Sequence, residues 1–183
     1  KYRNDLTHKI NSVALSGNTQ RLAVGDSKGG VTVHDFTTDS EVFNWSDASQ
    51  VFGVALSYTG SHLAACGAAK CARVFDIDSG AEVYHRAAND RLRAIALSGD
   101  GELCVVGGFD GQMQACNIQE GAHMRAHEQP DAMRSVALGG SAPRLAVGCD
   151  DGRCVLYSLV HAKAPQPDPT ASPGTAARQL IEA

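Results

Sequence analysis

The sequence predicts an all-β protein made of four small antiparallel sheets, each built from four short strands. A short apolar phrase returns four times at a constant interval of 41 residues, and its first apolar residues are Val13, Val54, Ile95 and Val136. The apolar runs between these phrases are too short for helices and show no 3.6-residue stripe. Turns rich in glycine, asparagine and aspartate separate the runs. A period of this length is typical of proteins in which small repeated units stack on one another.

The first repeat contains its four strands in order. "NSVALS" ends at the turn "GNTQ", "RLAVGD" ends at "SKGG", "VTVHDF" ends at "TTDS", and "EVFNW" completes the unit. The alternating β-branched residues of the third run are typical of a half-buried strand. We therefore expect inner strands near residues 10–16, 21–26 and 31–36, and three further sets, each displaced by 41 residues.

Glycine and alanine recur at fixed positions of the repeat. The turn between the second and third strands carries Gly29, Gly111 and Gly152, and the second repeat has Lys70 there. Asp-Gly at this point predicts a tight hairpin, because such a turn needs residues that tolerate positive φ. An alanine also follows the first apolar residue of every phrase, at positions 14, 55, 96 and 137. A small side chain lets neighbouring sheets approach closely, and sheets of this size must stack to bury both faces.

This layout resembles the WD-repeat β-propeller family, whose units run about 40–45 residues with four strands each. The Trp-Asp pair of that family ends the third strand. Its positions here hold His34-Asp35, Phe75-Asp76, Cys116-Asn117 and Tyr157-Ser158, so the tryptophan is absent and the aspartate is kept twice. The resemblance covers residues 1 to about 160. It implies four WD40-like four-stranded antiparallel blades, which form a partial or half β-propeller that acts by binding other proteins.

We divide the chain into WD40-like blades over residues 1–160 and a proline-rich linker or disordered tail over 161–183. Residues 1–4, "KYRN", fall at the register of a fourth strand, so we expect an outer strand that closes or precedes a blade. Because the resemblance implies seven or eight blades, three arrangements are open. In order of preference, the chain is part of a longer propeller, two copies pair into an eight-bladed ring, or four blades tighten into a small ring.

Composition and cysteine spacing exclude several classes of protein. The 183 residues carry a formal net charge of −4, which disfavours non-specific nucleic-acid binding. No apolar run approaches the roughly 20 residues that a membrane helix needs, and no secretory signal is visible. Neither Cys66 with Cys71 nor Cys149 with Cys154 forms a metal-binding CxxC pair. We therefore expect buried, reduced, metal-free thiols and a cytoplasmic location. A disulfide between Cys149 and Cys154 is the alternative.

The function predicted from the sequence is that of a non-catalytic protein–protein interaction scaffold built of WD40-like repeats. We expect it to be part of a larger propeller or assembly. No catalytic constellation and no glycine-rich cofactor motif stands out, so we expect no catalytic residues and no cofactor. The alternative is a fragment of a propeller enzyme with a cofactor or hydrolytic site in its central channel. Alanine and leucine at the inner-strand registers favour the scaffold.

The resemblance implies a partner-binding rim two and four residues before each repeated apolar residue. The candidate residues there are Lys9, Asn11, Phe52, Arg91, Arg93 and Arg134, beside Gln50 and Ala132. Arginine forks suit acidic or phosphorylated segments of a partner protein, and an exposed phenylalanine can anchor them. We expect no nucleic-acid or membrane partner. The alternative is that these arginines pair with Asp47, Asp90 and Asp131 in neighbouring loops, as surface ion pairs commonly do.

Overall fold

A computed structural model describes residues 8–121, 123–139 and 144–158, with only the backbone considered for 123–127. The first sheet contains β1 (Ile10–Leu15), β2 (Arg21–Asp26), β3 (Gly30–Asp35) and β4 (Ser40–Ser46). The second contains β5 (Val51–Leu56), β6 (His62–Gly67), β7 (Cys71–Asp76) and β8 (Glu82–Ala87). The third contains β9 (Leu92–Leu97), β10 (Leu103–Gly108), β11 (Gln112–Asn117) and β12 (His123–Glu128). The fourth contains β13 (Met133–Leu138), β14 (Arg144–Cys149) and β15 (Cys154–Ser158).

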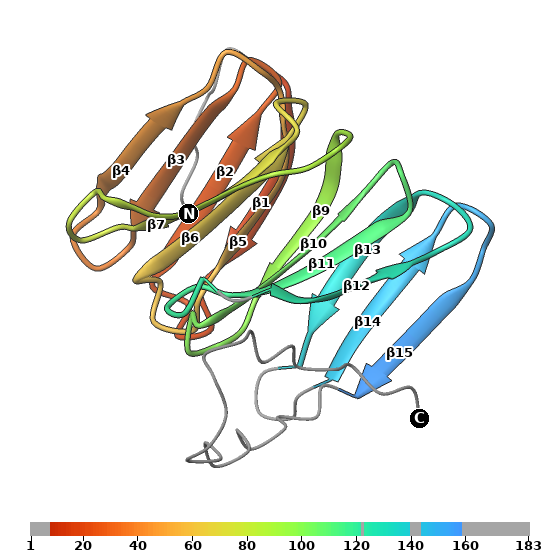
Figure 1. The fold of residues 1–183 in the computed structure, drawn as a ribbon. Helices are drawn as coiled ribbons and strands as arrows, with labels where there is room; N and C mark the ends of the chain where they lie inside the picture. The colour runs from red at the N-terminus through yellow and green to blue at the C-terminus, as the bar shows by residue number, and fades with distance from the viewer. Residues whose placement is uncertain (1–7, 122, 140–143, 159–183) are drawn as a thin grey trace, which may run out of the picture.

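Every sheet follows chain order with antiparallel neighbours, and Figure 1 shows the four sheets side by side as successive blades. The predicted inner strands and their displacement by 41 residues are thus confirmed, and no helix occurs among the described residues. The predictions for residues 1–4 and 161–183 concern segments outside the described residues. The fourth blade is described with three strands.

The serine that ends the apolar phrase has a structural role. The Ser16 hydroxyl accepts a hydrogen bond from the main-chain N–H of Arg21 at 2.9 Å, which closes the turn between β1 and β2. Ser57 and Ser98 do the same for the first residues of β6 and β10. Because Ser16 and Ser57 are almost fully buried, this hydrogen bond satisfies a polar group that would otherwise be costly to bury.

Each blade has two faces with different residues. We call the face that packs on the preceding blade the leading face, and the one that packs on the following blade the trailing face. Three apolar clusters fill the spaces between consecutive blades. In the first, Val51, Val54 and Leu63 of the second blade's leading face pack against the trailing face of the first blade. The trailing face there consists of Ala14, Ala23, Val31 and Val33. The recurring alanine therefore lies where neighbouring sheets approach, as expected.

The four blades form an open arc. Consecutive first strands β1, β5, β9 and β13 pack on one another, and β13 makes no comparable contact with β1 among the described elements. Val13 and Leu15 on the leading face of the first blade are 60% and 59% exposed. The closed four-bladed ring, one of the three arrangements left open by the sequence, is therefore wrong for the described residues.

The recurring glycine turn is confirmed at all four positions. Gly29, Gly111 and Gly152 have φ values of 97°, 72° and 86°, and Lys70 adopts a φ of 57° at the same register. Lysine is strained in this left-handed region because its Cβ approaches the carbonyl oxygen.

The cysteine prediction is right for five residues and wrong for one. All six cysteines are free in the structure, and Cys66, Cys71, Cys104, Cys116 and Cys149 are buried. Cys154 is exposed, because it lies on the trailing face of the fourth blade, which no described residue covers. That the thiols are reduced and metal-free in solution stays a prediction.

Candidate functional site

The rim at which first strands begin brings several of the predicted residues together. Phe52 and Arg93 are the second residues of β5 and β9, and Arg91 directly precedes β9. Antiparallel pairing of Leu92 with Gly108 places the end of β10 at the same edge. The turn after β10 therefore adds Phe109 to this rim.

Two arginine–aromatic contacts build the centre of the site. The Arg91 guanidinium carbon lies 4.8 Å from the ring centroid of Phe109, and that of Arg93 lies 5.7 Å from the ring centroid of Phe52. The two rings meet edge to face, with centroids 6.5 Å apart. Cations at these distances are attracted by the negative face of the ring. We call Phe52, Arg91, Arg93 and Phe109 the rim cluster.

Arg134 lies in the next blade and is paired. Its Nε donates to the Asp150 carboxylate, and this hydrogen bond holds the pKa of Asp150 below its usual range, with a weaker electrostatic contribution from Arg93. Arg93 is thus close enough to Asp150 to influence it. The structure therefore connects Arg134 to the rim cluster through Asp150, but its positive charge is compensated.

The loop aspartates do not pair with these arginines in the way the alternative predicted. Asp47, Asp90 and Asp131 each accept a hydrogen bond from the main-chain N–H of the following residue, at 2.6–2.7 Å. Asp47 also lies 3.9 Å from Arg73, and Asp90 lies 3.9 Å from Lys70. Neither Arg91 nor Arg93 has a carboxylate within ion-pair distance in the part of the chain that the structure describes.

Lys9 and Asn11 do not join the rim cluster. The Asn11 side-chain amide donates to the carbonyl oxygen of Val51 at 2.9 Å, which ties the first blade to the second. Lys9 is exposed, and its carbonyl oxygen accepts a hydrogen bond from the main-chain N–H of Ser27. One blade before the rim cluster, Asn11 occupies the position equivalent to Phe52, and Lys9 the position equivalent to Gln50.

Phe109 is a site residue that the sequence analysis missed. The sequence predicts only a tight turn around Gly111 and gives Phe109 no role, although the equivalent positions of the other repeats hold Ser27, Ala68 and Asp150. A large aromatic residue at a turn position otherwise held by small or polar residues was the available signal.

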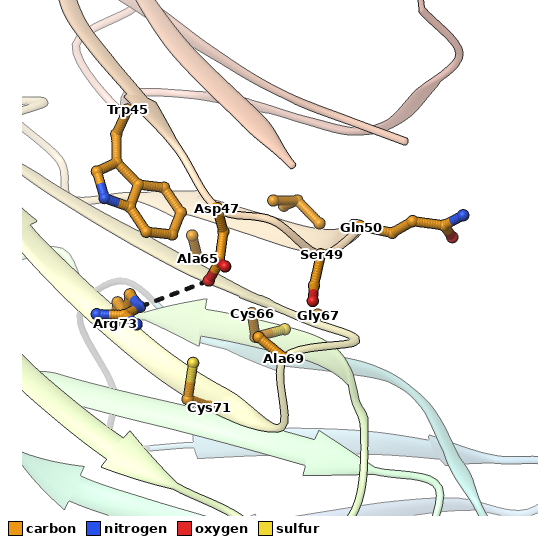
Figure 2. A pocket seen from close by; sticks show the side chains of 11 residues that line it. Trp45, Asp47, Ser49, Gln50, Ala65, Cys66, Gly67, Ala69, Cys71 and Arg73 are labelled. Atoms are coloured by element: carbon orange, nitrogen blue, oxygen red, sulfur yellow. Dashed lines mark ion pairs between the residues drawn. The ribbon is translucent and has the colours of Figure 1, made fainter. Parts of the chain in front are cut away.

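A separate hollow lies between the first and second blades. Figure 2 shows Trp45 and Arg73 at one side of it and Cys66 and Cys71 at another. The Arg73 guanidinium carbon lies 5.3 Å from the Trp45 ring centroid, and Asp47 is 3.9 Å from Arg73. The volume open to a water-sized molecule there is only about 10 Å³, far below the range of about 300–1,000 Å³ typical of small-molecule sites.

Further chemistry of the described residues is limited. Burial raises the pKa of the Cys66, Cys104 and Cys116 thiols, which lowers the fraction of reactive thiolate. No group of three or more histidine, cysteine or acidic residues placed to hold a metal ion is found in residues 8–121, 123–139 and 144–158. Within the same ranges, no helix is long and apolar enough to cross a membrane.

Comparison with solved structures identifies the fold. The WD40 repeats of RRP9 superpose with a TM-score of 0.72 at 11% identity, covering 85% of this chain and 52% of that one. Hydrazine synthase of Kuenenia stuttgartiensis gives 0.69 at 17% identity, covering 86% and 49%. The computationally designed Ika4 protein gives 0.73 at 18% identity, covering 87% and 96%.

The chain therefore spans about half the length of the first two structures and nearly all of the third. No protein-family model matches the sequence, and no curated protein matches it either. The degraded Trp-Asp positions account for this, because the residues that define the repeat in sequence are largely replaced. Strand order, the 41-residue displacement and the superposition on WD40 repeats together give this chain the fold of a partial WD40-type β-propeller.

Proposed function

We propose that this chain is a non-catalytic protein-interaction scaffold whose rim cluster binds an acidic or phosphorylated segment of a partner protein. The observation that carries the proposal is the pair of arginines stacked on aromatic rings with no carboxylate partner among the described residues. WD40-type architecture in the structural neighbours supports a binding role at the level of the fold.

The stacking prepares both arginines for an anion. A guanidinium that lies over a ring uses its flat face for the aromatic contact, and its N–H edge stays directed away from the ring. That edge can donate two parallel hydrogen bonds to a carboxylate or phosphate. Holding the side chain on a ring also reduces the rotamer entropy that is lost on binding. Arg91 is exposed, so its guanidinium is fully hydrated. Arg93 is half-buried, so its guanidinium is partly desolvated before a ligand binds.

The arrangement of the arginines favours an extended acidic ligand over a single ion. Arg134 lies in the next blade with its charge compensated by Asp150, so Arg91 and Arg93 supply the cationic surface of this rim. The overall charge of −4 means that attraction is local to this rim. Phe52 and Phe109 are half-buried and offer apolar surface between the two cations, which suits a segment with an apolar residue between acidic ones.

Charge reversal tests this proposal. Wild-type chain and an Arg91→Glu/Arg93→Glu variant are titrated with fluorescent acidic and phosphoserine peptides, and both are used to capture partners from native extract. Binding should weaken by about 2–5 kcal/mol if the contact is desolvated. Arg144→Glu is the control, because Arg144 is an exposed arginine that begins β14 at the opposite edge. Unchanged binding by a folded double variant would show that the rim cluster is ordinary surface.

An enzyme with a site in the central channel remains the alternative. The fold alone does not decide between the two, since one structural neighbour is a synthase. The inner-strand residues that pack between blades are mainly Ala, Val, Leu and Ile, which supports the scaffold. The six free cysteines support an intracellular location as part of the same proposal.

A further inference from the structure

The two ends of the arc carry exposed apolar residues whose counterparts in the other described blades are buried or partly buried. At the first blade, Ile10, Val13 and Leu15 are 45%, 60% and 59% exposed. The residues 41 positions later, Val51 and Val54, are 3% and 6% exposed, and Leu56 is partly buried against the same cluster. At the fourth blade, Leu156 is 60% exposed, whereas Val33 at the equivalent register is fully buried.

These two surfaces are the two halves of one repeated interface. Inside the chain, a leading face always packs on the trailing face of the blade before it. No described residue covers the leading face of the first blade or the trailing face of the fourth, which consists of Ala137, Ala146, Cys154 and Leu156. The equivalent residues Ala14, Ala23, Val31 and Val33 already receive a leading face within the chain. The ends are therefore complementary to each other, head to tail.

At two of the three joints inside the chain, a glycine makes room for the following blade, whereas the second blade has Cys66 at this position. A Cβ built on Gly25 would lie 2.7 Å from Val51 of the next blade, and one on Gly107 would lie 3.0 Å from Met133. These glycines thus make room for the first apolar residue of the following leading face. Gly148 is the equivalent glycine of the fourth blade, and a Cβ there would meet only its own blade's Ser135 within 4 Å. The residue at the register of Val51 and Met133 in the first blade is Ile10.

A hydrogen bond marks the same register. The Ser12 hydroxyl on the trailing face of the first blade accepts the main-chain N–H of Val54 at 3.1 Å. The second and third repeats have Gly53 and Ala94 at this position, and the fourth has serine again, Ser135. Ser135 can therefore accept the main-chain N–H of an incoming Val13 in the same way.

We propose that a second copy of this chain covers both ends, so that two arcs of four blades close into an eight-bladed ring. Each copy contributes one leading and one trailing face, and the two joints are equivalent by two-fold symmetry. Propellers contain roughly four to eight blades. One copy does not close, and three would exceed that range. Head-to-tail contacts end in a ring only if the rotation closes, so the proposal requires that two arcs of four blades complete one turn. The proposal is independent of the rim cluster.

Molar mass tests the proposal directly. The full 183-residue chain should elute with twice its 19.2 kDa mass in size-exclusion chromatography with light scattering, without growing at higher concentration. Val13→Asp should give a folded monomer under the same conditions. Val83→Asp is the matched control and should stay dimeric, because Val83 is 42% exposed on β8, in the middle of the arc.

Mixing two variants tests the orientation. Val13→Asp damages the leading face, and Leu156→Asp damages the trailing face. Each alone should be monomeric, whereas an equimolar mixture keeps one intact joint and should recover part of the dimer. Cys154 gives a second readout, because it should react with a thiol reagent in the Val13→Asp chain and be protected in the wild type.

Three results would overturn the proposal. A monomeric wild-type chain would show that the ends are covered in another way, by further blades or by other segments. A mass that rises continuously with concentration would indicate open filaments. A dimer that survives Val13→Asp or Leu156→Asp, with both variants folded by circular dichroism, would show that it forms through a different surface.

Discussion

The glycine turn between the second and third strands recurs in three blades. Alanine substitutions there measure how much free energy of unfolding is lost when a residue with a Cβ adopts a positive φ. Gly29, Gly111 and Gly152 share one register and one left-handed conformation, so alanine at each should cost about 1–2 kcal/mol for the backbone alone. Removing glycine also restricts the unfolded chain, which returns about 0.4–1 kcal/mol. The net cost from the backbone is therefore about 0.5–1 kcal/mol.

The three glycines differ in the space that is available for an added Cβ. At Gly29 an added Cβ would overlap the main-chain oxygen of Asp47, and at Gly111 it would overlap that of Gln129. At Gly152 no described atom lies within 4 Å of the added Cβ. Forcing an extra carbon into a packed site costs about 1–3 kcal/mol more. We expect Gly29→Ala and Gly111→Ala to lose about 1.5–4 kcal/mol, and Gly152→Ala about 0.5–1 kcal/mol.

Lys70 should respond in the opposite direction. Lys70→Gly removes the left-handed strain. It loses only two exposed contacts of the ammonium group, a 3.3 Å hydrogen bond to the Asn89 carbonyl oxygen and a 3.9 Å ion pair with Asp90, and such contacts contribute little. We expect a gain of up to about 1 kcal/mol. Urea unfolding and thermal melts measure all four variants, and 1 kcal/mol corresponds to roughly 2–4 °C for a chain of this size. Equal losses at the three glycines, or a loss for Lys70→Gly, would refute the reasoning.

Three further predictions concern the core, the charged turn and the thiols. Leu63→Ala should lower the free energy of unfolding by about 2–5 kcal/mol, because Leu63 is fully buried between the first two blades; a change below 1 kcal/mol in a urea melt would contradict this packing. Asp35→Asn should destabilise at neutral pH, because hydrogen bonds from Thr37 and then Arg21 hold the pKa of Asp35 below its usual range. The ionised carboxylate contributes stability above the ordinary aspartate pKa of about 3.9 and loses it as the pH falls through the lowered value, so the difference from wild type should shrink below about pH 4 in thermal melts. A difference that grows in acid would contradict that sign. In the Val13→Asp chain, one thiol should react with a thiol reagent before denaturation and six after it, as counted by absorbance; four or fewer after denaturation without reductant would indicate disulfides.

The sequence by itself determined the strands and their order. Each strand depends on its own short apolar run and on the turn residues beside it. The same pattern recurs four times at an interval of 41 residues, which makes it easy to recognise. The left-handed turn at Lys70 was also predictable, because glycine in the other three repeats revealed what the backbone requires. The same logic predicted buried cysteines, and it failed at Cys154 because burial depends on a neighbour that the repeat alone cannot supply.

Only the tertiary structure decided which rim residues meet. The register of the repeat treated Lys9, Asn11, Phe52 and the arginines alike, yet Asn11 bonds across to Val51 and Arg134 pairs with Asp150. Phe109 comes from a different turn, and it reaches Arg91 because antiparallel pairing brings the end of β10 beside the start of β9. Likewise, apolar residues at equivalent positions of the repeat are buried in the middle of the arc and exposed at its ends, as Val54 and Val13 are. A periodic sequence specifies the interface that each blade can form, and the number and arrangement of the blades determine which of those interfaces are filled.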